Sequence, residues 1–486
     1  MILRHLALLA ACSALAASLP GVERNGWPLL VAQPAGPGQP VDSWQALGPL
    51  FFGRSDQAGV RTGGLRPLFL QARENDREAQ YFLYPLFARQ RHGDHSRFSF
   101  FNLVNARREP EIDGAPGRRF DVWPFYFSRD TGKPETTYAA FFPLGGEIKS
   151  RFGKDRIGFA IFPLYARIDA RGGHTTYAPW PFLRFIDGGG HGGFEFWPLF
   201  GRRGRAGDYR DEFLLWPLFY RNAANLSAAQ PDVKLGALPF YARDTGPGYR
   251  SETFIWPFFG YTHRTEPERY DETRYLWPLL VQGRGADRYI NRWGPVYTHS
   301  IVKGHDKTWL LWPLVRNERW RTGSLEQEKT QLLFFLYWSL EQRSPAHPQA
   351  ASARKTHLWP LFSAWANGAG RQQVQLLSPF EVFFPQNDVV RQLYTPLFAV
   401  YRYDRRSPAE MRWSLLWSAV SWTEQPDRRE FHLGPLFSVE SDQDRRRIAL
   451  GNGLLGFHRA PGAGWRFFLF DFRPRSVNKA PAASPP

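Results

Sequence analysis

Short apolar segments alternate with polar stretches along almost the whole of this 486-residue chain. Phe213–Tyr220, for example, is apolar at every position, and the polar segment Arg202–Arg205 lies shortly before it. Apolar runs of this length, bounded by polar and glycine-containing segments, predict β-strands. The 40 Pro and 44 Gly residues are spread along the chain and would kink or fray long helices. We therefore predict an all-β fold.

A four-residue motif, aromatic-Pro-Leu-aromatic, lies at the centre of the apolar segments and recurs about every 19 residues. Asn102, Ser339 and Ser418 occupy the proline position in copies that lack it. The Trp-Pro pairs that we take as structural repeat residues are Trp123 and Pro124, Trp197 and Pro198, Trp216 and Pro217, Trp256 and Pro257, Trp277 and Pro278, Trp312 and Pro313, and Trp359 and Pro360. With the degenerate copies, the pattern predicts about 22 units.

The polar stretches between the motifs carry the residues that tight turns require. Arg129–Gly132 and Asp187–Gly190 combine Asp, which caps its own backbone, with Gly, which adopts positive φ. Each repeat is therefore interpreted as one strand of about ten residues plus one connection. Connections this short favour antiparallel neighbours. We predict about 22 antiparallel strands in a β-repeat domain over residues 45–472.

We predict that these strands form one large closed up-and-down barrel. The alternatives are a soluble β-propeller and a stacked β-repeat fold. Two features count against a membrane barrel. Both faces of Phe213–Tyr220 would be apolar, whereas strands of such a barrel alternate. Proline in mid-strand cannot donate to the ladder, so we expect each Trp-Pro step to be a bend or bulge repeated at one level of the structure.

The composition favours a folded protein and a surface partner of negative charge. Aromatic residues are 16% of the chain, too many for a disordered sequence. The formal net charge is +17, but Arg is interspersed with Asp and Glu rather than gathered in a basic stripe. We therefore expect no nucleic acid partner. Anionic lipids or glycans are possible partners, and the ligand is unknown.

The N-terminus predicts export. Residues 1–17 have a basic start, an apolar run and small residues, as export signals do. Leu9–Cys12 resembles the lipobox of bacterial lipoproteins, which implies cleavage before Cys12 and lipid attachment to its thiol. Cleavage after Ala14–Ala16 is the alternative and would remove the chain's only cysteine. We expect residues 18–44 to form a lead-in with a first degenerate repeat, and residues 473–486, rich in Pro and Ala, to be a disordered tail.

The chain contains no recognisable catalytic or cofactor motif. His92–His95 offers two imidazoles and a carboxylate, but it lies in a polar turn, where solvated side chains are the usual case. The acidic pairs Asp211-Glu212 and Asp271-Glu272 are typical of exposed ion pairs near turns. We therefore expect no catalytic residues, metal or cofactor, and not an enzyme.

The sequence thus predicts a non-enzymatic envelope protein, embedded in or anchored to the outer membrane, that acts as a structural component or a conduit. The alternative is a soluble, lipid-anchored binding module for a carbohydrate or protein, in the periplasm or secreted. An enzyme with a dispersed site is the third hypothesis. The repeated aromatic residues are interpreted as core packing, with an interface girdle or a sugar-stacking surface as the functional alternatives.

Overall fold

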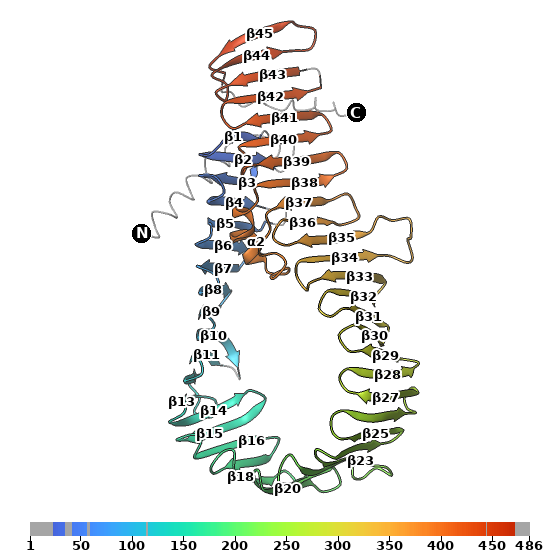
Figure 1. The fold of residues 1–486 in the computed structure, drawn as a ribbon. Coiled ribbons are helices and arrows are strands. Elements are labelled where there is room, and N and C mark those ends of the chain that lie inside the picture. The colour runs from blue at the N-terminus through green and yellow to red at the C-terminus, as the bar shows by residue number, and fades with distance from the viewer. Residues whose placement is uncertain (1–22, 35–40, 56–58, 113–114, 444, 472–486) are drawn as a thin grey trace, which may run out of the picture. The chain divides into compact units, whose positions relative to one another are not determined.

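A computed structural model describes residues 23–34, 41–55, 59–112, 115–443 and 445–471 (Figure 1). They form a 45-stranded antiparallel sheet in which strands pair with their neighbours along the chain, which confirms the all-β, up-and-down prediction. Two short helices interrupt it, α2 (Asp388–Leu393) and the 3-10 helix η1 (Thr395–Leu397). The chain divides into unit 1, Met1–Gly93 with Ser324–Pro486, and unit 2, Asp94–Gly323.

Unit 1 contains two runs of strands. The first run is β1 (Arg24–Gly26), β2 (Leu30–Pro34), β3 (Val41–Ala46), β4 (Phe51–Ser55), β5 (Arg61–Leu65), β6 (Phe69–Glu74), β7 (Arg77–Phe82) and β8 (Phe87–His92). The second run is β33 (Leu325–Leu332), β34 (Tyr337–Arg343), β35 (Ala353–Leu358), β36 (Phe362–Ala366), β37 (Gln372–Leu376), β38 (Tyr401–Ser407), β39 (Glu410–Leu415), β40 (Val420–Gln425), β41 (Arg428–Leu433), β42 (Phe437–Asp442), β43 (Arg445–Leu450), β44 (Leu455–Arg459) and β45 (Trp465–Leu469).

Unit 2 is a single run of paired strands. They are β9 (His95–Phe100), β10 (Val104–Ile112), β11 (Ala115–Val122), β12 (Tyr126–Asp130), β13 (Tyr138–Phe141), β14 (Gly145–Arg151), β15 (Lys154–Ala160), β16 (Tyr165–Ala170), β17 (Gly173–Tyr177), β18 (Leu183–Gly188), β19 (His191–Phe196), β20 (Phe200–Arg205), β21 (Tyr209–Leu214), β22 (Phe219–Ala224), β23 (Asp232–Ala237), β24 (Tyr241–Gly246), β25 (Tyr249–Phe254), β26 (Phe259–Arg264), β27 (Tyr270–Leu276), β28 (Leu280–Gly285), β29 (Arg288–Trp293), β30 (Tyr297–Val302), β31 (His305–Leu310) and β32 (Val315–Thr322).

Each repeat is a hairpin of two strands, so the predicted number of about 22 strands is wrong by a factor of two. The motif is not in the middle of a strand. Leu215–Leu218, for example, forms the tight turn between β21 and β22, each of which is 6 residues long. The physical reason is that proline has no N–H for the ladder, and a hairpin turn is where the ladder needs none. A second connection, which is polar, joins each hairpin to the next one.

The selected Trp-Pro pairs all lie in such turns, and each peptide bond before the proline is cis. The predicted mid-strand bend or bulge is therefore wrong, although these prolines do recur at one level, the turn end of the hairpins. Asn102 and Ser418 also lie in turns between strands. Ser339 lies inside β34 instead, and residues 333–336 form the preceding turn.

The predicted closure into a barrel is not present in the described residues. Pairing follows the order of the chain within each run, and β1 and β45 do not pair with each other. The sheet is therefore open.

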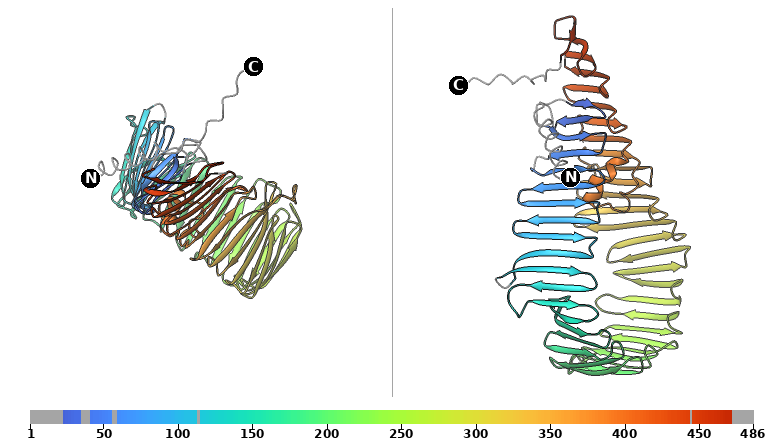
Figure 2. Two further views of the ribbon diagram at one scale, coloured as in Figure 1. Left: turned by 90° about the horizontal axis from the view of Figure 1, so that it is seen from above. Right: turned by 90° about the vertical axis from the view of Figure 1, so that its left-hand side faces the viewer.

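The apolar core is divided into small clusters. In unit 2, Phe127, Tyr138, Ile148 and Phe159 pack together over β12 to β15. In unit 1 the first run lies against the second, as Figure 2 shows for the blue and orange strands. The side-chain amide of Asn25 donates to the carbonyl of Ser418 over 2.7 Å. Unit 1 therefore has two layers with an interior between them.

Candidate functional site

The turns that contain the motif form a row along one end of the unit 2 hairpins, which we call the apolar rim. Its turns are residues 101–103, 123–125, 142–144, 161–164, 178–182, 197–199, 215–218, 238–240, 255–258, 277–279, 294–296 and 311–314. The aromatic side chains of the rim are largely exposed, at 50% for Trp216, 47% for Trp256 and 57% for Trp312. The interpretation of these tryptophans as core packing is therefore wrong. Large exposed apolar surfaces of this kind mark binding sites.

Backbone hydrogen bonds link each turn of the rim to the next. Leu215 N–H donates to the carbonyl of Leu199 over 2.6 Å, and Trp216 N–H donates to that of Pro198 over 2.7 Å. Leu218 N–H closes its own turn on Leu215. The same pattern recurs where Trp256 donates to Pro239 and Trp312 donates to Pro295. The rim thus satisfies many of the backbone groups that a turn normally presents to water.

Aromatic rings contact one another along the rim. The rings of Phe182 and Trp197 are 6.2 Å apart between centroids, and those of Trp197 and Trp216 are 6.1 Å apart. A second series joins Phe162 to Trp180 at 5.5 Å. Tilted contacts at these separations are favourable. They hold the rings in a row rather than as independent side chains.

The strands change from apolar to charged with distance from the rim. The row of strand residues beside the rim contains Phe196, Phe200, Leu214 and Phe219, which are cross-strand partners and are all exposed. Two residues further from the rim on the same face, Glu212 pairs with Arg202 and Arg221 across the strands. At about 3.3 Å per strand residue, the apolar zone including the turn is roughly 10 Å deep.

The opposite ends of the same hairpins are polar. There the turns include Thr131–Thr137, Ala206–Asp208 and Ala286–Asp287. Ion pairs between strands accompany them, such as the Arg203–Asp211 pair at 2.9 Å. In unit 2 the strands are therefore apolar at the end beside the rim and polar at the opposite end. Phe213–Tyr220 does not alternate between apolar and polar residues because it is not one strand. It consists of two strand ends joined by a turn.

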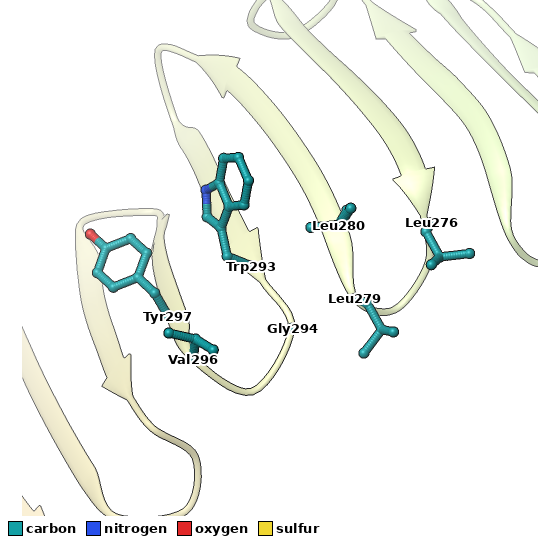
Figure 3. A pocket seen from close by; sticks show the side chains of 7 residues that line it. All are labelled: Leu276, Leu279, Leu280, Trp293, Gly294, Val296 and Tyr297. Atoms are coloured by element: carbon teal, nitrogen blue, oxygen red, sulfur yellow. The ribbon is translucent and has the colours of Figure 1, made fainter.

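The rim contains an open apolar hollow of ≈ 630 Å³ between two neighbouring turns (Figure 3). Leu276, Leu279, Leu280, Trp293, Gly294, Val296 and Tyr297 line it. Gly294 stands where most copies of the repeat have an aromatic residue before the proline. Its missing side chain leaves the space, since a Cβ there would contact only Leu279.

The other sites considered from the sequence have structural roles or lie outside the description. Cys12 and residues 473–486 fall outside the described residues. His92 pairs with Asp76 at 3.3 Å. In residues 23–471, apart from the gaps given above, no group of three or more His, Cys, Asp or Glu side chains is arranged to hold a metal ion.

In each of the two acidic pairs, the two carboxylates have different partners. Asp211 pairs with Arg203, whereas Glu212 pairs with Arg210. Glu272 accepts a 2.6 Å hydrogen bond from the Tyr270 hydroxyl, and His263 lowers the pKa of Asp271 by hydrogen bonding to it. Neighbouring residues of a strand point to opposite faces, so neither pair forms a two-carboxylate site.

No helix in the described part of the chain is long and apolar enough to cross a membrane. The chain matches no protein family model, and a search of curated proteins finds no similar sequence.

Proposed function

We propose that this protein is a non-enzymatic component of the cell envelope that binds a lipid membrane through its apolar rim. The exposed row of Trp, Phe and Leu side chains at one edge of the sheet carries the proposal. Tryptophan in particular favours the boundary between lipid and water. In this arrangement the hairpins stand with one end in the lipid head-group region, and their polar ends point away from it.

The depth of the apolar zone supports contact with one surface of a membrane. A zone of roughly 10 Å is comparable with the 5–10 Å reached by interfacial protein segments and is far less than the ~30 Å hydrocarbon core. The hydrogen bonds between successive turns support it further, because an unpaired backbone group in lipid costs several kcal/mol. The open hollow beside Gly294 is large enough to receive part of an acyl chain.

Flotation of the full chain with phospholipid vesicles tests this function. The protein carries Cys12→Ala and an export signal that requires no lipid, so that no lipid anchor contributes. We expect it to float with vesicles. The 62 Lys and Arg residues against 45 Asp and Glu should make binding stronger to anionic vesicles than to neutral ones. A protein that stays in the unbound fraction with both kinds of vesicle would show that the rim does not bind lipid.

A carbohydrate-binding function is the second candidate. The mutually contacting rings of Trp197, which is half-buried, and Trp216, which is exposed, are the observation that favours it, because flat aromatic surfaces stack on sugar rings. Binding to immobilised polysaccharide, blocked by soluble polysaccharide and unaffected by vesicles, would favour this candidate over the membrane.

A further inference from the structure

Unit 1 encloses a polar cavity of ≈ 600 Å³ between its two runs of strands and the segment that contains α2. Trp44, Arg66, Trp365, Arg402, Arg412 and Trp417 are among the residues that line it. A volume of 300–1,000 Å³ is typical of sites for small molecules. The cavity lies where the 24-residue connection from β37 to β38 replaces the usual short turn between two strands.

Two of the arginines at this cavity are neutralised by carboxylates. Arg412 donates from Nε and Nη2 to the two oxygens of Glu23, at 2.9 Å each. Burial alone would raise the pKa of Glu23, but the charge and hydrogen bonds of Arg412 lower it to about 2. Arg402 donates to Asp404 over 2.6 and 3.2 Å. Both cations therefore have an anion of their own.

Arg66 is different, because the groups that its guanidinium contacts directly are all neutral. Its Nε donates to the carbonyl of Gln392 and its Nη1 to that of Pro49, each over 2.7 Å. The guanidinium lies 3.7 Å from the centre of the Phe52 ring. Within the described part of the chain no carboxylate lies within ion-pair distance of it, and Nη2 has no hydrogen-bond partner. Arg66 is only 6% exposed.

The sequence position of Arg66 is also unusual. In Arg66-Pro67-Leu68-Phe69 it occupies the place before the proline that an aromatic residue has in most copies of the repeat. Before the proline, many turns of the rim have an exposed tryptophan, whereas this turn has a buried arginine. Burial and the like charge of Arg402 lower the pKa of Arg66 to about 9. A buried cation without an opposite charge is costly, and a bound anion would remove that cost.

We propose that this cavity binds a phosphate ester, with Arg66 as the residue that recognises the phosphate. The planar guanidinium matches the geometry of phosphate oxygens, and its contacts with Gln392, Pro49 and Phe52 hold it in place. The volume leaves room for a sugar or glycerol group, against which Trp44 and Trp365 can pack. The proposal does not depend on the apolar rim, since all of its residues belong to unit 1.

Calorimetric titration of the full-length Cys12→Ala protein tests the site. The soluble probe is glucose 1-phosphate, with glucose as the uncharged control. We expect saturable binding of the phosphate ester alone. Arg66→Gln should weaken it about tenfold or more, because a hydrogen bond to a charged group is lost. Arg61→Gln, on an exposed residue at the far end of β5, the strand that directly precedes Arg66, should leave binding unchanged.

A second variant protects the test if Arg66→Gln does not fold. Thr62→Trp leaves Arg66 in place and fills space from the same face of β5, at another residue that lines the cavity. We expect a folded protein whose binding of glucose 1-phosphate is lost. Unchanged binding in a folded Thr62→Trp variant would overturn the proposal.

Vesicles of phosphatidic acid and of phosphatidylcholine distinguish the source of the phosphate. Weaker binding of Arg66→Gln to phosphatidic acid vesicles, with equal binding to phosphatidylcholine, would assign the site to a lipid head group. Dependence on Arg66 with the soluble ester alone would assign it to a free metabolite. If binding of neither the soluble ester nor the vesicles depends on Arg66, the proposed phosphate site is wrong. The membrane function of the rim is tested separately, by flotation of the protein with vesicles.

Discussion

The same hairpin repeat occurs in both units, but the residue before the proline can be exposed or buried. In unit 2 the position before the proline holds an exposed Trp in many turns, including those of Trp216, Trp256 and Trp312. In unit 1 the corresponding position holds a buried cation in one hairpin, Arg66, and a neighbouring layer covers it. The turn backbone is therefore compatible with either type of side chain. What surrounds the turn decides whether the position serves an apolar surface or a polar interior.

An aromatic residue before the proline is not needed to form the turn. The turn at Arg66-Pro67 joins the paired strands β5 and β6 as the turn at Trp216-Pro217 joins β21 and β22. The geometry of the hairpin therefore does not require the exposed tryptophans of unit 2, and the proposed contact of the rim with an apolar partner would give them a role. Substitutions made in one unit at a time test this interpretation.

The largest effect is expected from the triple variant Trp216→Ser, Trp256→Ser and Trp312→Ser. Removing three exposed rings from the rim should lower vesicle binding at least about tenfold, because each ring contributes apolar area to the contact. Flotation measures the bound fraction, and circular dichroism checks the fold. The control is Phe152→Ser, which removes an aromatic side chain, 57% exposed, in the turn between β14 and β15, at the end of the hairpins away from the rim. Equal losses in both variants would contradict a specific role of the rim.

The next effect concerns the interior of unit 1. Glu23→Gln leaves the charge of Arg412 without its bidentate partner in a buried place, so we expect the free energy of unfolding to fall by about 3–5 kcal/mol. Urea denaturation measures it. Arg343→Gln breaks an exposed pair with Glu341 and should leave the stability unchanged within error. Similar losses for the two variants would show that the Glu23–Arg412 pair is not special.

His357 predicts a pH dependence of the same interior. Neither ring nitrogen has a hydrogen-bond partner within the residues that the structure describes, and burial lowers its pKa from 6.5 to about 4. The unfolded chain therefore binds a proton between pH 6.5 and 4 that the folded chain does not. The contribution of neutral His357 is complete above pH 6.5 and is lost as the pH falls to 4, on the order of 3 kcal/mol.

Comparing wild type with His357→Phe isolates this dependence from that of the other histidines. The wild type should lose more stability than the variant between pH 6.5 and 4 in urea denaturation. Parallel pH curves for the two proteins would rule out His357 as the cause.

The smallest effect distinguishes two neighbouring glycines of β19 in unit 2. A Cβ at Gly193 would lie 2.6 Å from the carbonyl oxygen of Arg202 and 2.7 Å from the Cα of Arg203, so Gly193→Ala should cost about 1–3 kcal/mol. At Gly192 a Cβ meets no atom within 4 Å. Gly192→Ala should therefore be tolerated. The midpoints of thermal unfolding compare them, and equal midpoints would mean that the sheet adjusts at Gly193.

The sequence was sufficient to predict the repeat, its period and the antiparallel all-β fold. It misled about the hairpin because tight turns usually contain Gly, Asn or Asp, whereas Leu215–Leu218 is entirely apolar. Two apolar strand ends joined by an apolar turn cannot be distinguished by hydrophobicity from one apolar strand. The missing N–H of Pro217 was the available signal, since a central strand tolerates no such residue in every repeat.

The exposed rim and the cavity were harder to predict. Repeated Trp residues are equally typical of a core, and only the neighbouring layer, present in unit 1, decides their exposure. Arg66 offered a sequence signal, because it breaks the consensus directly before Pro67. Its burial depends on Gln392, which is 326 residues away in the chain, and no local pattern contains that contact.

The chain-order pairing of the strands has a consequence for how the protein folds. A hairpin needs only residues that are close in sequence, so its loop-closure cost is small and folding can proceed hairpin by hairpin as the chain emerges. Unit 1 is the exception, because Asn25 meets Ser418 only after 393 residues have been joined. Its inner layer must wait for the last hairpins. We therefore expect the step that forms the cavity to be slower than the formation of a single hairpin, because it closes a much longer loop.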